Sequence, residues 1–263
     1  MFDFQNFVFS QDTHDIFEGM TSISAVIRSV LDGSSDRQIF AVIYDPTKAH
    51  KKMREMSYIN KMAEIIGFDV IAADADRISD LTSGDTHGGI IAITSKRSFS
   101  DNIVKYLTNS DFFVLIDGIE DPYNFGYSVR SLYAAGADGI ILPPRNWMEL
   151  SGVVARSSAG TSELAKLFIC DTYEAAKLLK EHGYKIVCAS IRDSVSLYDY
   201  DFNQPVLLIV GGEKRGISRK LLELSDANVR IDYGRDFMGS LPSASAVSVI
   251  AFEISRQKSA KTK

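Results

Sequence analysis

The chain has 263 residues, of which 45% are hydrophobic and 24% are charged, as in ordinary globular proteins. The net charge of −5 argues against a protein that binds nucleic acid through bulk positive charge, although it leaves room for local basic patches. No apolar run approaches the ~20 residues that span a bilayer, and no basic leader precedes the first apolar residues. We therefore expect a cytoplasmic protein without a membrane segment.

The first hundred residues predict a small α/β domain, in which helices alternate with short apolar strands. Ile23, Val26, Ile27 and Val30 have helical spacing, and Gly33 is placed to end that helix. Strands are predicted at residues 39–44, 68–73 and 88–94, with further helices at 51–67 and 77–84.

A polar, unpatterned segment at residues 95–102 predicts a boundary between a domain of residues 1–98 and a domain of residues 99–263. Beyond it, strands are predicted at residues 112–116, 139–142, 185–189, 206–210 and 229–231. Helices are predicted at residues 127–135, 147–156, 173–182, 218–224 and 244–257. Short strands flanked by helices predict a mostly parallel sheet with helices on both faces, so the fold class is α/β.

Cys170 and Cys188 lie in or beside apolar, strand-like runs. We interpret them as buried free thiols of a reducing compartment. No cluster of cysteine and histidine has the spacing of metal ligands, so no zinc or iron site is expected.

The first motif follows the strand at 112–116, where the chain enters an acidic turn with proline and glycine. Asn124 and Gly126 are assigned to this turn, Arg130 to the first turns of the next helix, and Gly136 to its end. Ligands bind at the carboxyl ends of strands in open α/β sheets, and the guanidinium of Arg130 suits a phosphate. Alone, the pattern also fits an ordinary turn with a surface arginine.

The second motif is Gly211, Gly212 and Glu213, followed by Gly216 and a candidate helix cap, Ser218. Paired glycines at a strand end let the backbone approach a ligand closely. The pattern lacks the glycine fingerprint of dinucleotide-binding proteins and the lysine–serine pair of a phosphate loop. Alone, it is also compatible with a structural turn.

The third motif is the start of the last predicted helix, where residues 243–246 all have small side chains. Small side chains let a helix start pack closely on other backbone, and that packing alone would explain them.

In order and spacing, the three motifs resemble the SpoU/TrmH family of RNA ribose 2′-O-methyltransferases. The family pattern is an N-x-G-x-x-x-R turn, a strand followed by G-x-E-x-x-G, and S-L-N before a small-residue helix. The matching residues are Asn124, Gly126 and Arg130; Gly211, Glu213 and Gly216; and Ser240, Leu241 and Glu253. The resemblance covers roughly residues 112–257, and residues 1–98 resemble the family's ribosomal-protein-like RNA-binding domain.

The resemblance implies a trefoil-knotted catalytic domain that binds S-adenosyl-L-methionine, works as a homodimer, and methylates ribosomal RNA in preference to tRNA. By position, it assigns the reactive edge to Asn124, Arg130, Glu213 and Ser240. It assigns the cofactor contacts to Gly211, Gly212, Ile231 and Leu241, largely through backbone. A guanidinium stays protonated throughout the physiological pH range, so it cannot accept a proton. We therefore interpret Arg130 as an electrostatic stabiliser rather than a base.

The sequence departs from the family pattern at Pro242, where the family has asparagine, and at Ala244, where it has serine. Proline suits the first turn of a helix, but it removes a polar side chain from the site. This loss and the acidic balance motivate an alternative, namely an RNA-binding or assembly protein that kept the fold without turnover. A dehydrogenase-like nucleotide-binding domain is disfavoured because the glycine fingerprint is missing.

Overall fold

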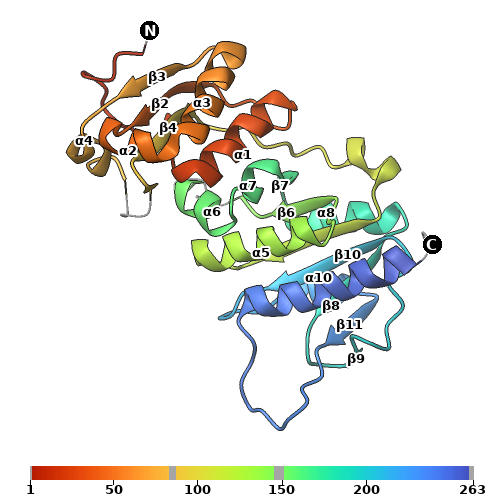
Figure 1. The fold of residues 1–263 in the computed structure, drawn as a ribbon. Coiled ribbons are helices and arrows are strands. Elements are labelled where there is room, and N and C mark those ends of the chain that lie inside the picture. The colour runs from red at the N-terminus through yellow and green to blue at the C-terminus, as the bar shows by residue number, and fades with distance from the viewer. Residues whose placement is uncertain (1, 83–86, 145–150, 261–263) are drawn as a thin grey trace. The chain divides into compact units, whose positions relative to one another are not determined.

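A computed structural model describes residues 2–82, 87–144 and 151–260 of the chain, which form two compact units (Figure 1). The first unit holds the described residues of 1–98 and 146–164, and the second holds those of 99–145 and 165–263. The chain thus passes between the units after Ser98. The predicted division differs in one respect, because residues 151–164 pack with the first unit.

The first unit is built on a four-stranded mixed sheet in the order β1-β4-β2-β3. Its strands are β1 (His14–Glu18), β2 (Ile39–Tyr44), β3 (Asp69–Ala72) and β4 (Ile90–Ser95). β4 runs antiparallel to both β1 and β2, whereas β3 runs parallel to β2. The sequence predicted three of these strands and missed β1, whose sequence HDIFE contains only two adjacent apolar residues.

The helices of this unit are α1 (Gly19–Leu31), α2 (Pro46–Ala49), the 3-10 helix η1 (His50–Lys52), α3 (Met53–Ile66), α4 (Ala75–Ser79), α6 (Ser151–Ser157) and α7 (Thr161–Leu164). The helix predicted at 51–67 is the later part of a longer helical stretch that begins at Pro46. The side chain of Asp45 caps its start by accepting from Thr47 N at 2.9 Å. Gly67 ends α3 in the left-handed conformation, with φ +92°.

Residues 151–164 are held in the first unit by close packing against β1 and α1. Ala155 is buried in the same core as Phe17. A Cβ atom on Gly152 would lie 2.4 Å from the Ile16 carbonyl oxygen, and one on Gly160 would lie 2.4 Å from Ala25 Cβ. The glycines therefore let this segment lie directly on β1 and α1. The predicted helix at 147–156 is observed as α6, and its residues before 151 lie outside the described part of the chain.

The second unit contains a seven-stranded parallel sheet in the order β7-β6-β5-β10-β8-β11-β9. Its strands are β5 (Phe112–Asp117), β6 (Gly139–Leu142), β7 (Leu167–Ile169), β8 (Lys185–Ala189), β9 (Ser194–Ser196), β10 (Val206–Gly211) and β11 (Ala227–Arg230). This confirms the predicted α/β fold with a mostly parallel sheet. The trefoil knot stays a prediction, because strand order does not define how residues 231–242 are threaded.

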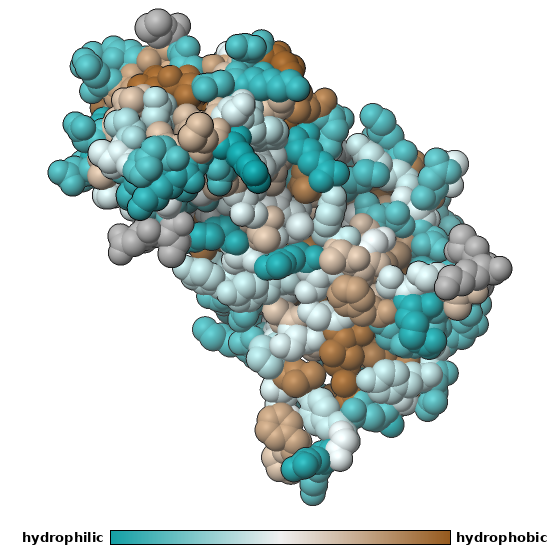
Figure 2. Space-filling view, in the orientation of Figure 1, coloured by the Kyte–Doolittle hydropathy of each residue, from teal (hydrophilic) through white to brown (hydrophobic). Residues whose placement is uncertain are grey.

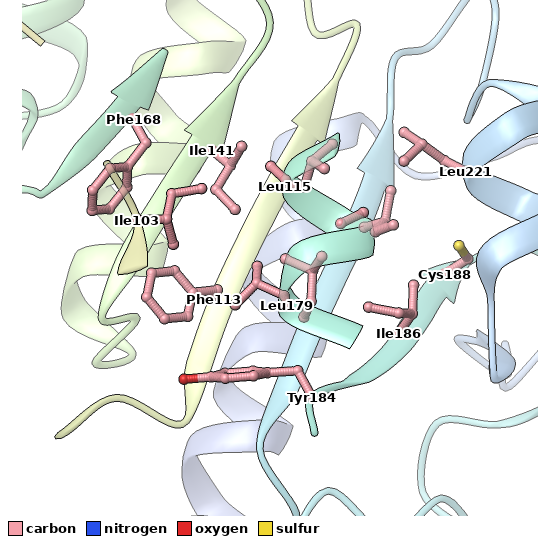
Figure 3. Close-up of a cluster of buried hydrophobic side chains, with 14 residues drawn as sticks. Ile103, Phe113, Leu115, Ile141, Phe168, Leu179, Tyr184, Ile186, Cys188 and Leu221 are labelled. Carbon is pink, nitrogen blue, oxygen red and sulfur yellow. The ribbon is translucent and has the colours of Figure 1, made fainter. Parts of the chain in front are cut away.

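Helices cover both faces of this sheet. They are η3 (Val104–Asn109), α5 (Pro122–Ala134), α8 (Thr172–Glu181), α9 (Arg219–Leu224) and α10 (Ser243–Ala260). Figure 3 shows the core beneath α8, where Phe113 and Leu115 of β5 meet Leu179. α5 and α10 pack side by side on the opposite face, where Ser248 Oγ donates to Ser131 Oγ at 2.7 Å.

Both cysteines belong to this unit and have free thiols. Cys188 is buried as predicted, whereas Cys170 is only half-buried because it lies just beyond the end of β7. Burial raises the pKa of both thiols to about 11, so both stay protonated near neutral pH.

Candidate functional site

A pocket of about 360 Å³ opens at the carboxyl ends of β5 and β10, the neighbouring strands at the centre of the parallel sheet. Asp117 and Gly211, the last residues of the two strands, are paired in register. The pocket is lined by the loops that follow both strands and by the first residue of α10, Ser243. It lies where the chain leaves β5 toward β6 on one side and leaves β10 toward β11 on the other, the usual ligand position in such sheets.

The two loops below this pocket touch through their backbones. Gly118 turns the chain after β5 with φ +104°. A Cβ atom on Gly212 would lie 1.9 Å from the Gly118 carbonyl oxygen, and one on Gly211 would lie 2.3 Å from the Gly216 carbonyl carbon. The paired glycines were predicted to admit a ligand, but the structure shows that contact within the chain itself already requires them.

Replacing Gly212 with alanine should lower the free energy of unfolding by about 3 kcal/mol, because the new methyl group would overlap a fixed backbone oxygen. Urea denaturation of the purified variant would measure this loss. Gly234→Ala is the matched control, since a Cβ atom there has no atom within 4 Å. A Gly212→Ala variant as stable as this control would contradict the loop contact.

α5 begins earlier than predicted, so Asn124 and Gly126 lie inside the helix and not in the turn before it. Pro122 is the first helical residue, and the side chain of the N-cap Asp121 accepts from Asn124 N at 2.8 Å. Gly126 is buried and lacks a positive φ. The residue that makes the tight turn is Gly118, whereas Gly136 follows the end of α5 with φ +84°, as predicted.

The three sequence motifs meet at Glu213. Its Oε1 atom accepts from Asn124 Nδ2 at 3.3 Å and from Ser243 N at 3.3 Å. The carboxylate therefore joins the start of α5 to the start of the 18-residue helix α10, whose N-terminus carries partial positive charge.

Pro242 occupies the cap position of α10, where its carbonyl oxygen accepts from Ser245 N and Ala246 N. A proline there has no side-chain oxygen to offer to the first free N–H groups of the helix. Glu213 supplies this acceptor from another loop. Despite the departure from the family pattern at Pro242, the first N–H group of α10 therefore has an acceptor.

Of the other carried-over residues of the second and third motifs, Gly216 lines this pocket, whereas Gly211, Ser240, Leu241 and Glu253 do not. Ser240 is exposed, and Leu241 N donates to the Tyr233 hydroxyl at 3.3 Å. Ile231 follows β11 directly. Among the described residues that line the pocket, Ser243 takes the place predicted for Ser240, and neither Ile231 nor Leu241 is present. The assignment of these residues to a cofactor stays a prediction.

Arg130 lies on α5 but away from Asn124. Six residues of helix place the two side chains about 120° apart around the axis. Arg130 is exposed and forms no hydrogen bond or ion pair with the described residues. Within one copy of the chain, Asn124 lines the pocket and Arg130 does not, so the role of Arg130 stays a prediction.

Several charged residues of the pocket were missed from the sequence. Asp117 ends β5, and its Oδ2 accepts from Ser218 N at 2.8 Å, which fixes the loop after β10. Ser218 is the cap residue of α9, as predicted. Lys214 and Arg215 add two cations to the same lining. The sequence pattern could have indicated Asp117, because it is a polar residue directly after five apolar strand residues.

The described part of the chain lacks both a metal-ligand cluster and a membrane-spanning helix. It contains no group of three or more histidine, cysteine or acidic side chains that could hold a metal ion. Within the same residues, no helix has both the length and the apolar character needed to cross a membrane.

Known proteins are similar to this chain over most of its length. A 23S rRNA (guanosine-2'-O-)-methyltransferase RlmB of Ralstonia nicotianae is 28% identical over 216 residues, which cover 81% of this chain and 86% of the relative. A putative TrmH family tRNA/rRNA methyltransferase of Staphylococcus saprophyticus is 26% identical and covers 89% of this chain and 93% of its own length.

The fold is also that of solved structures. The AdoMet-bound rRNA methyltransferase from Sinorhizobium meliloti superposes with a TM-score of 0.76 at 23% identity, covering 92% of this chain and 87% of its own. The SpoU methyltransferase AviRb from Streptomyces viridochromogenes has a TM-score of 0.74 at 22% identity, covering 94% of this chain and 91% of its own. The model of the SpoU rRNA Methylase family matches residues 111–252, more than half of the chain. The chain therefore belongs to the SpoU rRNA Methylase family.

Proposed function

We propose that this protein transfers a methyl group from S-adenosylmethionine to a ribose 2′-hydroxyl of ribosomal RNA in the cytoplasm. The reaction class follows from family membership, and relatives named as 23S rRNA guanosine methyltransferases favour ribosomal RNA over tRNA. The observation that carries the proposal is the meeting of Asn124, Glu213 and Ser243 in one pocket at the carboxyl ends of β5 and β10.

The pocket fits the proposed cofactor and substrate in size and charge. Its volume lies within the range of small-molecule sites. Carboxylates of Asp117, Glu120, Asp121 and Glu213 line it and complement a sulfonium cation. Gly211, Gly212, Ile231 and Leu241 stay the proposed backbone contacts of the cofactor, which when bound would supply an electrophilic methyl group. They lie outside the lining of this pocket, so they would hold the part of the cofactor that extends beyond it.

The residues of the chain would then position the ribose. The Glu213 carboxylate, held by Asn124 and by the start of α10, would accept a hydrogen bond from the attacking hydroxyl. Lys214 and Arg215 would bind the neighbouring phosphates.

The direct test incubates the protein with labelled S-adenosylmethionine and, in separate reactions, 23S rRNA and tRNA, followed by nuclease digestion and mass spectrometry. A 2′-O-methylated nucleoside at a defined position is the expected result. Its absence from both ribosomal RNA and tRNA would favour the non-catalytic alternative. The capping of α10 by Glu213 keeps the start of the helix intact without the family's asparagine, but it does not replace the polar side chain whose loss motivates that alternative.

Arg130→Lys should lower methyl transfer by about tenfold or more, because a lysine keeps the charge but loses the planar fork that suits a phosphate or a developing alkoxide. Single-turnover kinetics with bound RNA would measure the effect, and calorimetry should show unchanged cofactor affinity. Arg219→Lys is the control, since the Arg219 side chain is 91% exposed and outside the pocket. Near-normal turnover would exclude a role for the fork.

We also propose that the protein forms a homodimer through a tyrosine stripe on α5, formed by Tyr123, Tyr127 and Tyr133. These side chains are 46%, 48% and 38% exposed, and Phe252 of the adjacent α10 is 51% exposed. Figure 2 shows hydrophobic surface gathered around α10. Exposed aromatic surface of this kind is typical of interaction sites, and Arg130 lies within it.

Tyr127→Glu should raise the dimer dissociation constant by about tenfold or more, because it buries a charge without a partner. Sedimentation velocity would measure this constant. Tyr198→Glu adds the same charge at an exposed tyrosine outside the stripe and should leave it unchanged. Equal effects of the two variants would place the interface elsewhere.

A further inference from the structure

We infer that Asp117 is a positioning residue for methyl transfer, because it holds in place the loop that carries Glu213. This loop consists of residues 212–218, which connect β10 to α9. The role rests on the proposed function, which sets Glu213 beside the attacking ribose hydroxyl. It deepens that function by adding a residue that acts on the reaction through Glu213 and not through the substrate.

Asp117 ties both ends of the loop to the end of β5. At the start of the loop, Gly212 N donates to the Asp117 carbonyl oxygen at 3.1 Å. At its end, Ser218 N donates to Asp117 Oδ2 at 2.8 Å, across 101 positions of the chain. Bonds from an N–H group to a carboxylate are charge-assisted and stronger than bonds between neutral groups. Since β5 is paired with strands on both sides, its last residue is a firm anchor for the loop.

The middle of the loop is placed from these two ends. Residues 213–215 are exposed, so packing in a core does not fix their side chains. Gly216 N donates to Gly212 O at 2.9 Å, which closes a short turn around these residues. The turn keeps its shape through this bond, whereas its place beside the end of β5 depends on the bonds to Asp117.

The contacts of Glu213 are the ones that a displaced loop would lose first. Its Oε1 atom accepts from Asn124 Nδ2 and from Ser243 N, both at 3.3 Å. These bonds are longer than the ~2.9 Å that is usual for N–H donors, whereas the bond from Ser218 N to Asp117 measures 2.8 Å. A shift of ~1 Å in a group that positions a substrate can lower a rate by about 100-fold. Loss of the Asp117 carboxylate should therefore slow the reaction although Glu213 itself is unchanged.

Direct contact with the substrate is the alternative role, because Asp117 also lines the pocket. The two roles differ in their response to an amide. Asp117→Asn keeps one oxygen that accepts from Ser218 N, but it replaces the other oxygen with a donor. Positioning of the loop survives this change, whereas a hydrogen bond from the substrate to the second oxygen does not.

Steady-state methyl transfer from S-adenosylmethionine to 23S rRNA by the full chain tests this role. Asp117→Ala should lower kcat by about tenfold or more. KM for the cofactor should stay within about twofold, because Gly212 is held by the backbone of Asp117, which alanine keeps. Asp117→Asn should keep kcat within about threefold of the wild-type value.

Asp226→Ala is the matched control for the loss of such a bond. Asp226 Oδ2 also accepts from a backbone N–H group, that of Ile186, at 2.8 Å, and Asp226 lies outside the pocket. This variant should keep the wild-type kcat even where it lowers stability. Trypsin should cleave after Lys214 or Arg215 about tenfold faster in Asp117→Ala, but not in Asp117→Asn or Asp226→Ala.

A double variant tests whether Asp117 acts through Glu213. Asp117→Ala combined with Glu213→Ala should be no more than about twofold slower than Glu213→Ala alone, because no carboxylate remains to be positioned. The role is overturned if the two losses multiply, if Asp117→Asn is as slow as Asp117→Ala, or if Asp226→Ala lowers kcat equally. A wild-type protein that methylates neither 23S rRNA nor tRNA refutes the proposed function. A protein that methylates 23S rRNA equally fast with and without the Asp117 carboxylate refutes the role of Asp117 alone.

Discussion

Replacing Glu213 with alanine is expected to lower methyl transfer to RNA by about 100-fold, while the free energy of unfolding changes by no more than about 1 kcal/mol. The activity falls because one carboxylate joins Asn124 of α5 to Ser243 of α10, so its loss releases both sides of the pocket. The stability changes little because Glu213 is exposed, and an exposed acceptor is replaced by water at small cost. Initial rates with labelled S-adenosylmethionine, together with urea denaturation, would measure the two effects.

Two further variants separate the charge of Glu213 from its hydrogen bonds and control for the loss of an exposed carboxylate. Glu213→Gln keeps an oxygen acceptor for Ser243 N but removes the charge, so it should retain more activity than alanine if positioning dominates. Glu223→Ala removes an exposed carboxylate paired with Arg219 on the neighbouring helix α9 and should leave the rate unchanged. A Glu213→Ala enzyme with more than half of the wild-type rate would show that the meeting of the three motifs is structural only.

The sequence predicted those elements whose apolar pattern is long enough to be distinctive. The helices α1 and α3 end at the glycines expected to end them, because Gly33 and Gly67 adopt positive φ angles that other residues resist. The strands β7 and β9 were missed, since each has only three residues and such a length carries no periodicity. The start of α5 was placed too late, although Asp121 and Pro122 are a regular capping pair.

The site was predictable in its residue types more than in its contacts. Asn124 and Glu213 are separated by 89 positions, and only the pairing of β5 with β10 brings them together. The third partner of this cluster is Ser243 and not Ser240, because α10 begins one residue after Pro242 and directs its first N–H group at Glu213. Helix capping by a carboxylate from a distant loop leaves no trace in local sequence, so this contact required the fold.

The assignment of residues 151–164 to the first unit also required the fold, and it depends on a buried ion cluster. Arg37 Nε and Nη2 donate to the two carboxylate oxygens of Glu163 at 2.8 and 3.3 Å, and Arg37 Nη1 donates to Asp15 Oδ2 at 2.5 Å. The side chains of Arg37, Asp15 and Glu163 are 0%, 4% and 4% exposed. Although burial acts to lower the pKa of Arg37, the charges of Glu163 and Asp15 outweigh it and raise that pKa above its ordinary value. Arg37 therefore stays protonated in the core of the unit.

A truncation placed at the predicted boundary, residue 98, would break this cluster. It removes Arg37 and Asp15 but leaves Glu163 and the apolar Ala155 without the surface that buries them. A loss of RNA binding in such a fragment could then come from the missing first unit or from the disrupted residues 151–164. Single substitutions in the full chain are the cleaner way to assign a role to the first unit.

Arg37→Met should lower the free energy of unfolding by about 3–5 kcal/mol, because it keeps the apolar stem but leaves Glu163 buried without its cation. Asp15 loses less stabilisation than Glu163, since it keeps a second cation, Lys96, whose Nζ lies 2.7 Å from Asp15 Oδ1. Urea denaturation would measure the loss, and hydrogen exchange should become faster in residues 151–164 than in α3.

Arg219→Met is the control, because its pair with Glu223 is exposed and contributes at most about 0.5 kcal/mol. The double variant Arg37→Met with Glu163→Leu should recover part of the loss, since it removes the unpaired charge. If the double variant is instead less stable than Arg37→Met, the ion pair itself, and not the cost of an unpaired carboxylate, holds residues 151–164 in the first unit.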